Sequence, residues 1–212
     1  APYSFDWTTD ADGVRTITAR ARDDVGAVTT SDAVSVDVEG PSGPALLVSD
    51  DFHRDALDAG VWRFSSRVGD GSARLSDGQL VIEVPGGPAH DLWRPGNDGV
   101  TVMQDVVTDG DFVVEADFRS MPTLGFQIQG LLVEAAPDSF TRFDVYHDGS
   151  GLFAFSASID DGDPTFHGSV PIAQSGLDGI RLRLERDGSQ YTASYSVDGT
   201  NWVQVTSFTR SA

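Results

Sequence analysis

The chain has 212 residues, no cysteine and a formal net charge of −19, with 33 acidic residues against 14 basic ones. So acidic a chain repels nucleic acid and anionic membranes, and no apolar run approaches the roughly 18 residues that cross a bilayer. Nucleic acid and membrane insertion are therefore not expected, and without cysteine there are no disulfides or thiol chemistry.

The first segment, residues 1–39, is predicted to contain three short strands. They cover Pro2–Trp7, Val14–Ala21 and Val34–Val38, and Asp-Gly and Asp-Asp-Val-Gly turns separate them. The segment resembles the C-terminal half of a bacterial immunoglobulin-like domain. Because a complete sandwich of that kind needs about 7 strands, we expect either that the sequence begins inside such a domain or that the missing strands come from elsewhere. Residues 40–46, rich in glycine and proline, are expected to form a linker.

Residues 47–212 are predicted to form strand after strand, with Asp-Gly and Pro-Gly turns between them and no long helical period. The expected strands are 79–84, 101–107, 112–119, 125–134, 141–147, 152–159, 180–186, 191–197 and 202–208. This pattern predicts an all-β fold, a jelly-roll β-sandwich.

The expected strand 112–119 carries Glu115 and Asp117, and Ser120 follows three residues after Asp117. This spacing resembles the catalytic strand of laminarinase-type β-sandwich glycosidases, in which a third carboxylate occupies the position of Ser120. A retaining glycosidase needs two carboxyl groups roughly 5 Å apart, so the serine removes the expected proton donor. The same alternation also suits any half-buried strand, and both interpretations remain open.

Several motifs in order along residues 50–208 resemble concanavalin A-like lectin/glucanase modules, of the kind attached to β-xylosidases and other secreted carbohydrate-active proteins. They are Asp51-Phe52, Ser76-Asp77-Gly78-Gln79-Leu80, Gly110-Asp111-Phe112, Gln129-Gly130-Leu131-Leu132-Val133, Arg142-Phe143 and Tyr195 to Trp202. The resemblance implies a non-catalytic, lectin-like module that binds a polysaccharide or glycan. It also implies an extracellular or cell-surface location and covalent linkage to further domains of a larger protein.

If the strands from 112 to 159 were neighbours in a meander, their outward polar side chains would share one face. We expect this face to bind carbohydrate, because planar polar groups match hydroxyls and an aromatic ring matches the apolar side of a sugar. The predicted members are Glu115, Asp117, Arg119, Gln127, Gln129, Arg142, Asp144 and Tyr146, with Ser156 and Ser158 beside them. The alternative is a solvated sheet face with charge pairs between strands.

His90 and Trp93 lie in a loop rich in glycine and proline, and we expect them to add to the sugar-binding surface. Trp93 equally suits a plug at the open end of the sandwich.

The acidic turn with Asp160, Asp161 and Asp163 offers carboxylates to a structural Ca²⁺, although it lacks the EF-hand spacing. Asp50 and Asp51 are a second candidate pair for Ca²⁺. A plain acidic turn is the alternative at 160–163.

Two other functions remain open. One is a structural or adhesive role in a surface protein, with the immunoglobulin-like half completed by strand addition from another chain. The other is a glycoside hydrolase or polysaccharide lyase with an unrecognised site. An alginate-lyase-like site is disfavoured, because Gln129 stands where that motif has a histidine base.

Overall fold

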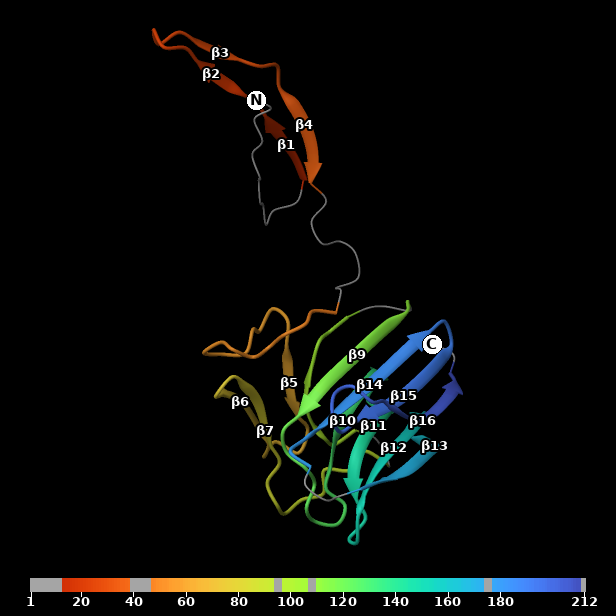
Figure 1. Ribbon diagram of the computed structural model, residues 1–212. Helices are drawn as coiled ribbons and strands as arrows, with labels where there is room; N and C mark the ends of the chain where they lie inside the picture. Colours follow the sequence, from red (N-terminus) through yellow and green to blue (C-terminus); the bar gives the residue numbers. More distant parts are fainter. Residues whose placement is uncertain (1–12, 39–46, 94–96, 107–109, 174–176, 211–212) are drawn as a thin grey trace. The chain divides into compact units, whose positions relative to one another are not determined.

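The computed structural model describes residues 13–38, 47–93, 97–106, 110–173 and 177–210 (Figure 1). The chain divides into two compact units. The first ends at Val48, and the second begins at Ser49 and takes in the rest of the chain apart from a short piece that begins at Val106. We describe each unit by itself.

The described part of the first unit consists of two antiparallel strand pairs. Strand β1 (Gly13–Ile17) pairs with β4 (Val34–Val38), and β2 (Arg20–Arg22) pairs with β3 (Val28–Thr30). The turn between β2 and β3 is held by Asp23, whose Oδ1 accepts hydrogen bonds from two backbone amides.

The strand prediction for this unit is only partly confirmed. The predicted strand Val34–Val38 is present, whereas the predicted strand Val14–Ala21 is interrupted after Ile17 and continues as β2. The predicted strand Pro2–Trp7 lies outside the described residues.

The described residues of the second unit contain strands and no helix, so no helix there could cross a membrane. The strands are β5 (Arg63–Ser66), β6 (Ser72–Ser76), β7 (Gln79–Glu83), β8 (Val100–Met103), β9 (Phe112–Phe118), β10 (Ile128–Ala136), β11 (Ser139–His147), β12 (Leu152–Asp160), β13 (Asp163–Ile172), β14 (Ile180–Asp187), β15 (Gln190–Ser196) and β16 (Val203–Thr209).

Two four-stranded antiparallel sheets form the body of the second unit (Figure 1). One has the strand order β10-β11-β12-β13, and the other has the order β16-β15-β14-β9. Strand pairs β5–β8 and β6–β7 complete the unit. The all-β sandwich that the sequence predicts is therefore confirmed.

The core lies between the two sheets and follows from the alternation of side chains along each strand. Phe143 and Val145 of β11 pack with Leu182 and Leu184 of β14, and all four are fully buried. Burying a side chain of this size contributes about 1.5–3 kcal/mol relative to leaving it exposed.

Strand β13 is the longest strand that the sequence did not predict. It contains Pro164 and Pro171, and proline cannot donate a hydrogen bond to a neighbouring strand. β13 tolerates them because it lies at the edge of its sheet, paired on one side only with β12.

The predicted meander of strands 112–159 is wrong at its first step. Strand β9 pairs with β14 in one sheet, whereas β10 pairs with β11 in the other sheet. The alternation within β9 is nevertheless as expected, because Phe112 and Phe118 pack against the core. The chain between β9 and β10 thus passes from one sheet to the other.

Candidate functional site

The outer face of the β10–β13 sheet is the most distinctive surface of the second unit. The strand registers place its side chains in rows across the four strands. The rows are Ile128, Tyr146, Phe153 and Pro171, then Gly130, Asp144, Phe155 and Ser169, then Leu132, Arg142, Ala157 and Phe166.

Five aromatic rings are connected by contacts on this side of the sheet, and we call them the aromatic face: Trp93, Tyr146, Phe153, Phe155 and Phe166. Tyr146 stacks on Phe153 with ring centroids 5.5 Å apart and meets Phe155 edge to face at 5.6 Å. Phe155 also contacts Phe166 at 5.6 Å and Trp93 at 6.1 Å. Phe166 is 60% exposed and the other four rings are half-buried, so the face reaches solvent.

A buried ion pair lies within the aromatic face. Arg142 Nε donates to Asp144 Oδ2 at 2.6 Å, and the two residues are only 8% and 3% exposed. Arg142 also donates from Nη1 to the carbonyl oxygen of Leu92 at 3.2 Å, and its guanidinium carbon lies 5.1 Å from the centroid of the Phe155 ring. Arg142 thus ties the Leu92–Trp93 segment to the sheet.

The second oxygen of Asp144, Oδ1, is buried and accepts no hydrogen bond from the described residues. Burial raises the pKa of Asp144, and the nearby Arg142 opposes that shift. Such an unpaired carboxylate oxygen is costly in a folded protein, and it has acceptor capacity to spare.

Gly130 of β10 pairs with Asp144 of the neighbouring strand β11. A larger residue at position 130 would require local rearrangement. A Cβ atom there would lie 2.3 Å from the carbonyl oxygen of Phe143 and 2.5 Å from the Cα atom of Asp144. The close approach of β10 to β11 at this point therefore requires glycine.

Of the residues predicted to bind carbohydrate, the structure brings together Trp93, Arg142, Asp144 and Tyr146. Phe153, Phe155 and Phe166 are further members of this face that the sequence does not predict, and the prediction that Ser156 and Ser158 lie on it is wrong. The register pairs Ser156 with Phe143 and Ser158 with Thr141, so both serines point into the sandwich. The run Leu152-Phe153-Ala154-Phe155 could have indicated this. Its even-numbered and odd-numbered residues are all apolar, and such a run is typical of a strand covered on both faces.

Glu115, Asp117 and Arg119 do not belong to this surface, which corrects the prediction of one shared polar face. Glu115 and Asp117 lie on β9 in the other sheet and face outward there. Arg183 Nη2 lies 2.6 Å from Glu115 Oε1, and Arg119 and Arg181 lie 2.9 and 3.4 Å from Asp117 Oδ2.

Gln127 and Gln129 use their amide groups to hold the chain between β9 and β10. Gln127 Oε1 accepts hydrogen bonds from the backbone amides of Thr123 and Leu124, at 2.9 and 3.0 Å. Gln129 donates to the carbonyl oxygen of Ser120 and accepts from its hydroxyl. Both amides therefore already have partners within the protein.

His90 is likewise held within the loop region. Its Nε2 lies 2.7 Å from Asp70 Oδ1, and little of its side chain reaches solvent.

Of the candidate Ca²⁺ ligands in the turn at 160–163, Asp160 is held by an ion pair. Asp160 Oδ1 accepts from Arg210 Nη2 at 2.5 Å, and Asp161 adopts φ +52° in the turn that ends at Asp163. Among the described residues no three acidic or histidine side chains gather as a metal would require. A Ca²⁺ site at this turn stays a prediction.

The pair Asp50 and Asp51 is a poorer candidate for Ca²⁺. Asp50 accepts from the amide of Phe52 with one oxygen and from the indole of Trp62 with the other, both at 2.9 Å. These hydrogen bonds lower the pKa of Asp50. Both oxygens of the Asp50 carboxylate thus have hydrogen-bond partners within the second unit, and a Ca²⁺ site there stays a prediction.

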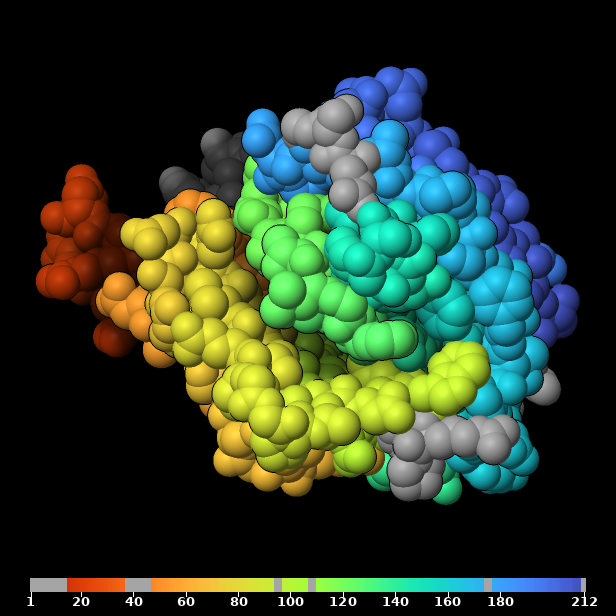
Figure 2. Space-filling view, turned by 90° about the horizontal axis from the view of Figure 1, so that it is seen from below, coloured from red at the N-terminus to blue at the C-terminus, as the bar shows by residue number. Residues whose placement is uncertain are grey.

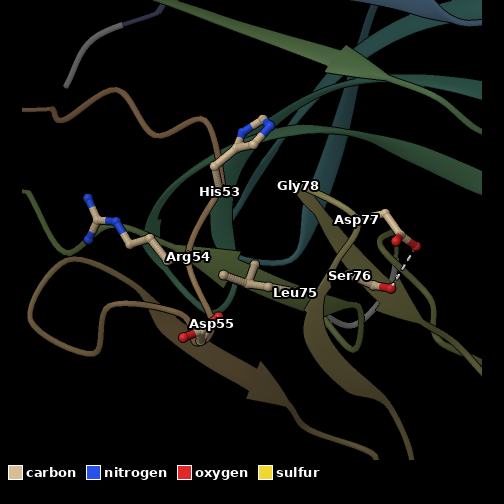
Figure 3. A pocket seen from close by; sticks show the side chains of 7 residues that line it. All are labelled: His53, Arg54, Asp55, Leu75, Ser76, Asp77 and Gly78. Atoms are coloured by element: carbon tan, nitrogen blue, oxygen red, sulfur yellow. Dashed lines mark hydrogen bonds between the residues drawn. The ribbon is translucent and has the colours of Figure 1, made fainter.

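An open cavity of about 340 Å³ lies near the start of the second unit (Figure 3). Its lining residues are His53, Arg54, Asp55, Leu75, Ser76, Asp77 and Gly78. The charged side chains point in different directions, and Asp77 is bonded to Ser76 (Figure 3). Because no polar groups converge there, we do not take it as the functional site.

The Tyr195 to Trp202 motif forms a turn. Asp198 accepts hydrogen bonds from Thr200 and Asn201, which lower the pKa of its carboxyl group. The turn leads to Trp202, whose ring centroid lies 3.9 Å from the guanidinium carbon of Arg183. This motif is explained by structure alone.

Figure 2 shows that the surface of the second unit is hollowed between the yellow to lime segment after β7 and the bright green segment after β9. The first of these segments leads to Leu92 and Trp93, which contact Arg142 and Phe155.

Comparison with known proteins identifies similar folds but does not identify a family. No family model matches the chain, and no curated protein is similar to it. Among solved structures, a mutant of the GH43 protein BlXynB from Bacillus licheniformis is similar, with a TM-score of 0.61 and 17% sequence identity. The xyloglucan PUL protein GH43B from Bacteroides ovatus has a TM-score of 0.59 and 13% identity.

These two comparisons cover 89% and 90% of this chain, but only 37% and 38% of the GH43 chains. A functionally unknown protein from Saccharomyces cerevisiae is also similar, with a TM-score of 0.51 and 16% identity over 71% of this chain and 80% of that one. At such identities the likeness shows a shared fold, and the chain spans just over a third of the two GH43 structures it resembles.

Proposed function

We propose that this chain is a non-catalytic, lectin-like carbohydrate-binding module, and that it binds glycan on the aromatic face. The observation that carries the proposal is a connected set of rings, partly open to water, over a buried arginine–aspartate pair. Phe166, 60% exposed, is the most open of these rings. Apolar patches of this kind mark interaction sites on soluble proteins.

The chemistry of the face suits a sugar. One side of a sugar ring is lined with C–H groups and can pack on an aromatic ring, while its hydroxyls seek hydrogen-bond partners. Tyr146 and Phe166 supply ring surface, and the buried Arg142–Asp144 pair lies beneath it.

The similar GH43 structures support a carbohydrate-related role. GH43 proteins are glycoside hydrolases, and one of the two is described with xyloglucan. Because this chain resembles only 37–38% of those chains, we propose that it is an accessory part of a larger secreted or cell-surface protein.

The paired carboxylates of β9 favour binding over hydrolysis. Glu115 and Asp117 are each engaged by arginine, and Ser120 is bonded to Gln129. A retaining glycosidase would need a second carboxyl group across a substrate from the first.

The test is affinity electrophoresis through gels that contain neutral polysaccharides, xyloglucan among them. Phe166→Ala and Tyr146→Ala should each weaken binding by about 2- to 10-fold, as the loss of one aromatic contact implies. Val113→Ala is the matched control, because Val113 is 59% exposed on β9 in the other sheet. Retardation that is absent for the parent, or equal for the parent and both variants, would refute the proposal.

A second candidate is a structural or adhesive role for the first unit. Ile17 on β1 and Val34 on β4 are 43% and 61% exposed, so this strand pair presents aliphatic side chains that an added strand from another chain could cover. Light scattering tests it, because strand addition predicts concentration-dependent oligomers.

A further inference from the structure

Phe126 is an unusual residue beside the aromatic face. It has φ +67° and is 88% exposed. Positive φ is sterically costly for a bulky residue, and the exposed ring gains almost nothing from burial. The backbone strain at Phe126 is not offset by burial of its ring, which suggests that the ring contacts a ligand.

The turn that carries Phe126 is firmly held. The Phe126 amide donates to the carbonyl oxygen of His147 at 2.7 Å, and the His147 amide donates to that of Gln127 at 3.1 Å. Gln127 Oε1 accepts from the amides of Thr123 and Leu124. The direction of the Phe126 ring is therefore set by a hydrogen-bonded turn that keeps it in water.

Phe126 lies next to one edge of the aromatic face. It precedes Ile128, which pairs with Tyr146 in the first row, and its amide bonds the residue that follows Tyr146. Phe166 lies on β13 at the opposite edge of the same sheet. Since neighbouring strands are about 4.8 Å apart, the distance across the four strands is about 14 Å.

We propose that Phe126 is the far contact of the aromatic face, and that the ligand is an extended, uncharged glycan chain lying across all four strands from β13 to the turn before β10. This inference rests on the proposed function and adds the length and charge of the ligand. A single sugar ring cannot reach both edges. An anionic polysaccharide is disfavoured, because the protein carries a net charge of −19 and the buried pair leaves no net positive charge on the face.

Binding is measured by isothermal titration with neutral xyloglucan and xylan, with their oligosaccharides of increasing length, and with alginate as the anionic comparison. For the parent, affinity should rise with chain length and then level off. For Phe126→Ala it should level off at a shorter length and end about 2- to 10-fold weaker, with Val113→Ala unchanged.

A stability measurement separates a ligand contact from a structural role. Phe126→Gly should raise the midpoint of urea unfolding, because glycine adopts positive φ without strain. A lowered midpoint would mean that the ring stabilises the fold, and would overturn the inference.

The outcomes are distinguishable. No neutral glycan bound by the parent refutes the proposed function and this inference together. Binding by the parent with the same length dependence for Phe126→Ala refutes only the inference, as does binding of alginate as tight as that of the neutral chains.

Discussion

The buried ion pair between Arg142 and Asp144 should respond strongly to the loss of one partner. Asp144→Ala leaves the Arg142 guanidinium in a site where its side chain is only 9% exposed, with the Leu92 carbonyl and the Phe155 ring as remaining contacts. Breaking a buried pair in this way costs about 3–5 kcal/mol, because the remaining charge has lost both its partner and its water. We expect the lower end of that range, since two contacts of Arg142 survive.

Replacing both partners should cost far less. The attraction within a buried pair is largely offset by the desolvation of two charges, so an apolar pair of similar size is often neutral or stabilising. Arg142→Met combined with Asp144→Leu is therefore expected to recover most of the stability that Asp144→Ala loses.

The measurement is urea unfolding at pH 7, followed by circular dichroism and tryptophan fluorescence. Glu115→Ala provides the control, because Glu115 and Arg183 have the same 2.6 Å separation but are 42% and 29% exposed. An exposed pair contributes about 0–1 kcal/mol. Equal losses for Asp144→Ala and Glu115→Ala, or no recovery in the double variant, would refute the reasoning.

Two further predictions concern other parts of the sandwich. Burial lowers the pKa of His167, which is bonded to Ser158 and stacked on Phe208, so the folded protein favours the neutral ring. Stability should therefore fall as the pH drops below about 6.5 toward the lowered pKa, and thermal melts should show a weaker dependence in His167→Gln. Gly130→Ala should destabilise by about 1–3 kcal/mol in urea, because its Cβ would lie 2.3 Å from the Phe143 carbonyl oxygen; a neutral effect would contradict so close an approach of β10 and β11 at that point.

The sequence predicted the strands well where apolar side chains alternate. Strand β14 buries Ile180, Leu182 and Leu184 and leaves the arginines between them exposed or partly exposed, so its pattern indicates both a strand and its inward face. Alternation does not indicate which strand lies alongside. The pairing of β9 with β14 brings together Glu115 and Arg183, which are 68 residues apart in the chain, and a meander prediction cannot find it.

The candidate site was half predicted for a related reason. Tyr146 and Trp93 can be predicted, because aromatic residues among polar ones suggest a binding surface. Phe153 and Phe155 cannot, because polar residues such as Ser156 and Ser158 are expected to face water, and that expectation points the phenylalanines inward. In the structure the serines are buried between the sheets, and the phenylalanines face outward. In a strand covered on both faces, the polarity of a side chain alone does not indicate which face of the sheet it lies on.

The two outer faces of the sandwich differ in what they offer a ligand. On the β9–β14 side, Glu115 and Asp117 are already paired with arginine in contact with water, and a ligand would have to displace those partners. On the β10–β13 side, the charged pair is buried, one carboxylate oxygen lacks a donor among the described residues, and Phe166 is 60% exposed. Moving exposed rings out of water favours association. The same carboxylates that suggest a sugar enzyme in the sequence thus lie on the face that offers a ligand less, and under the proposed function the binding energy should come from the aromatic face.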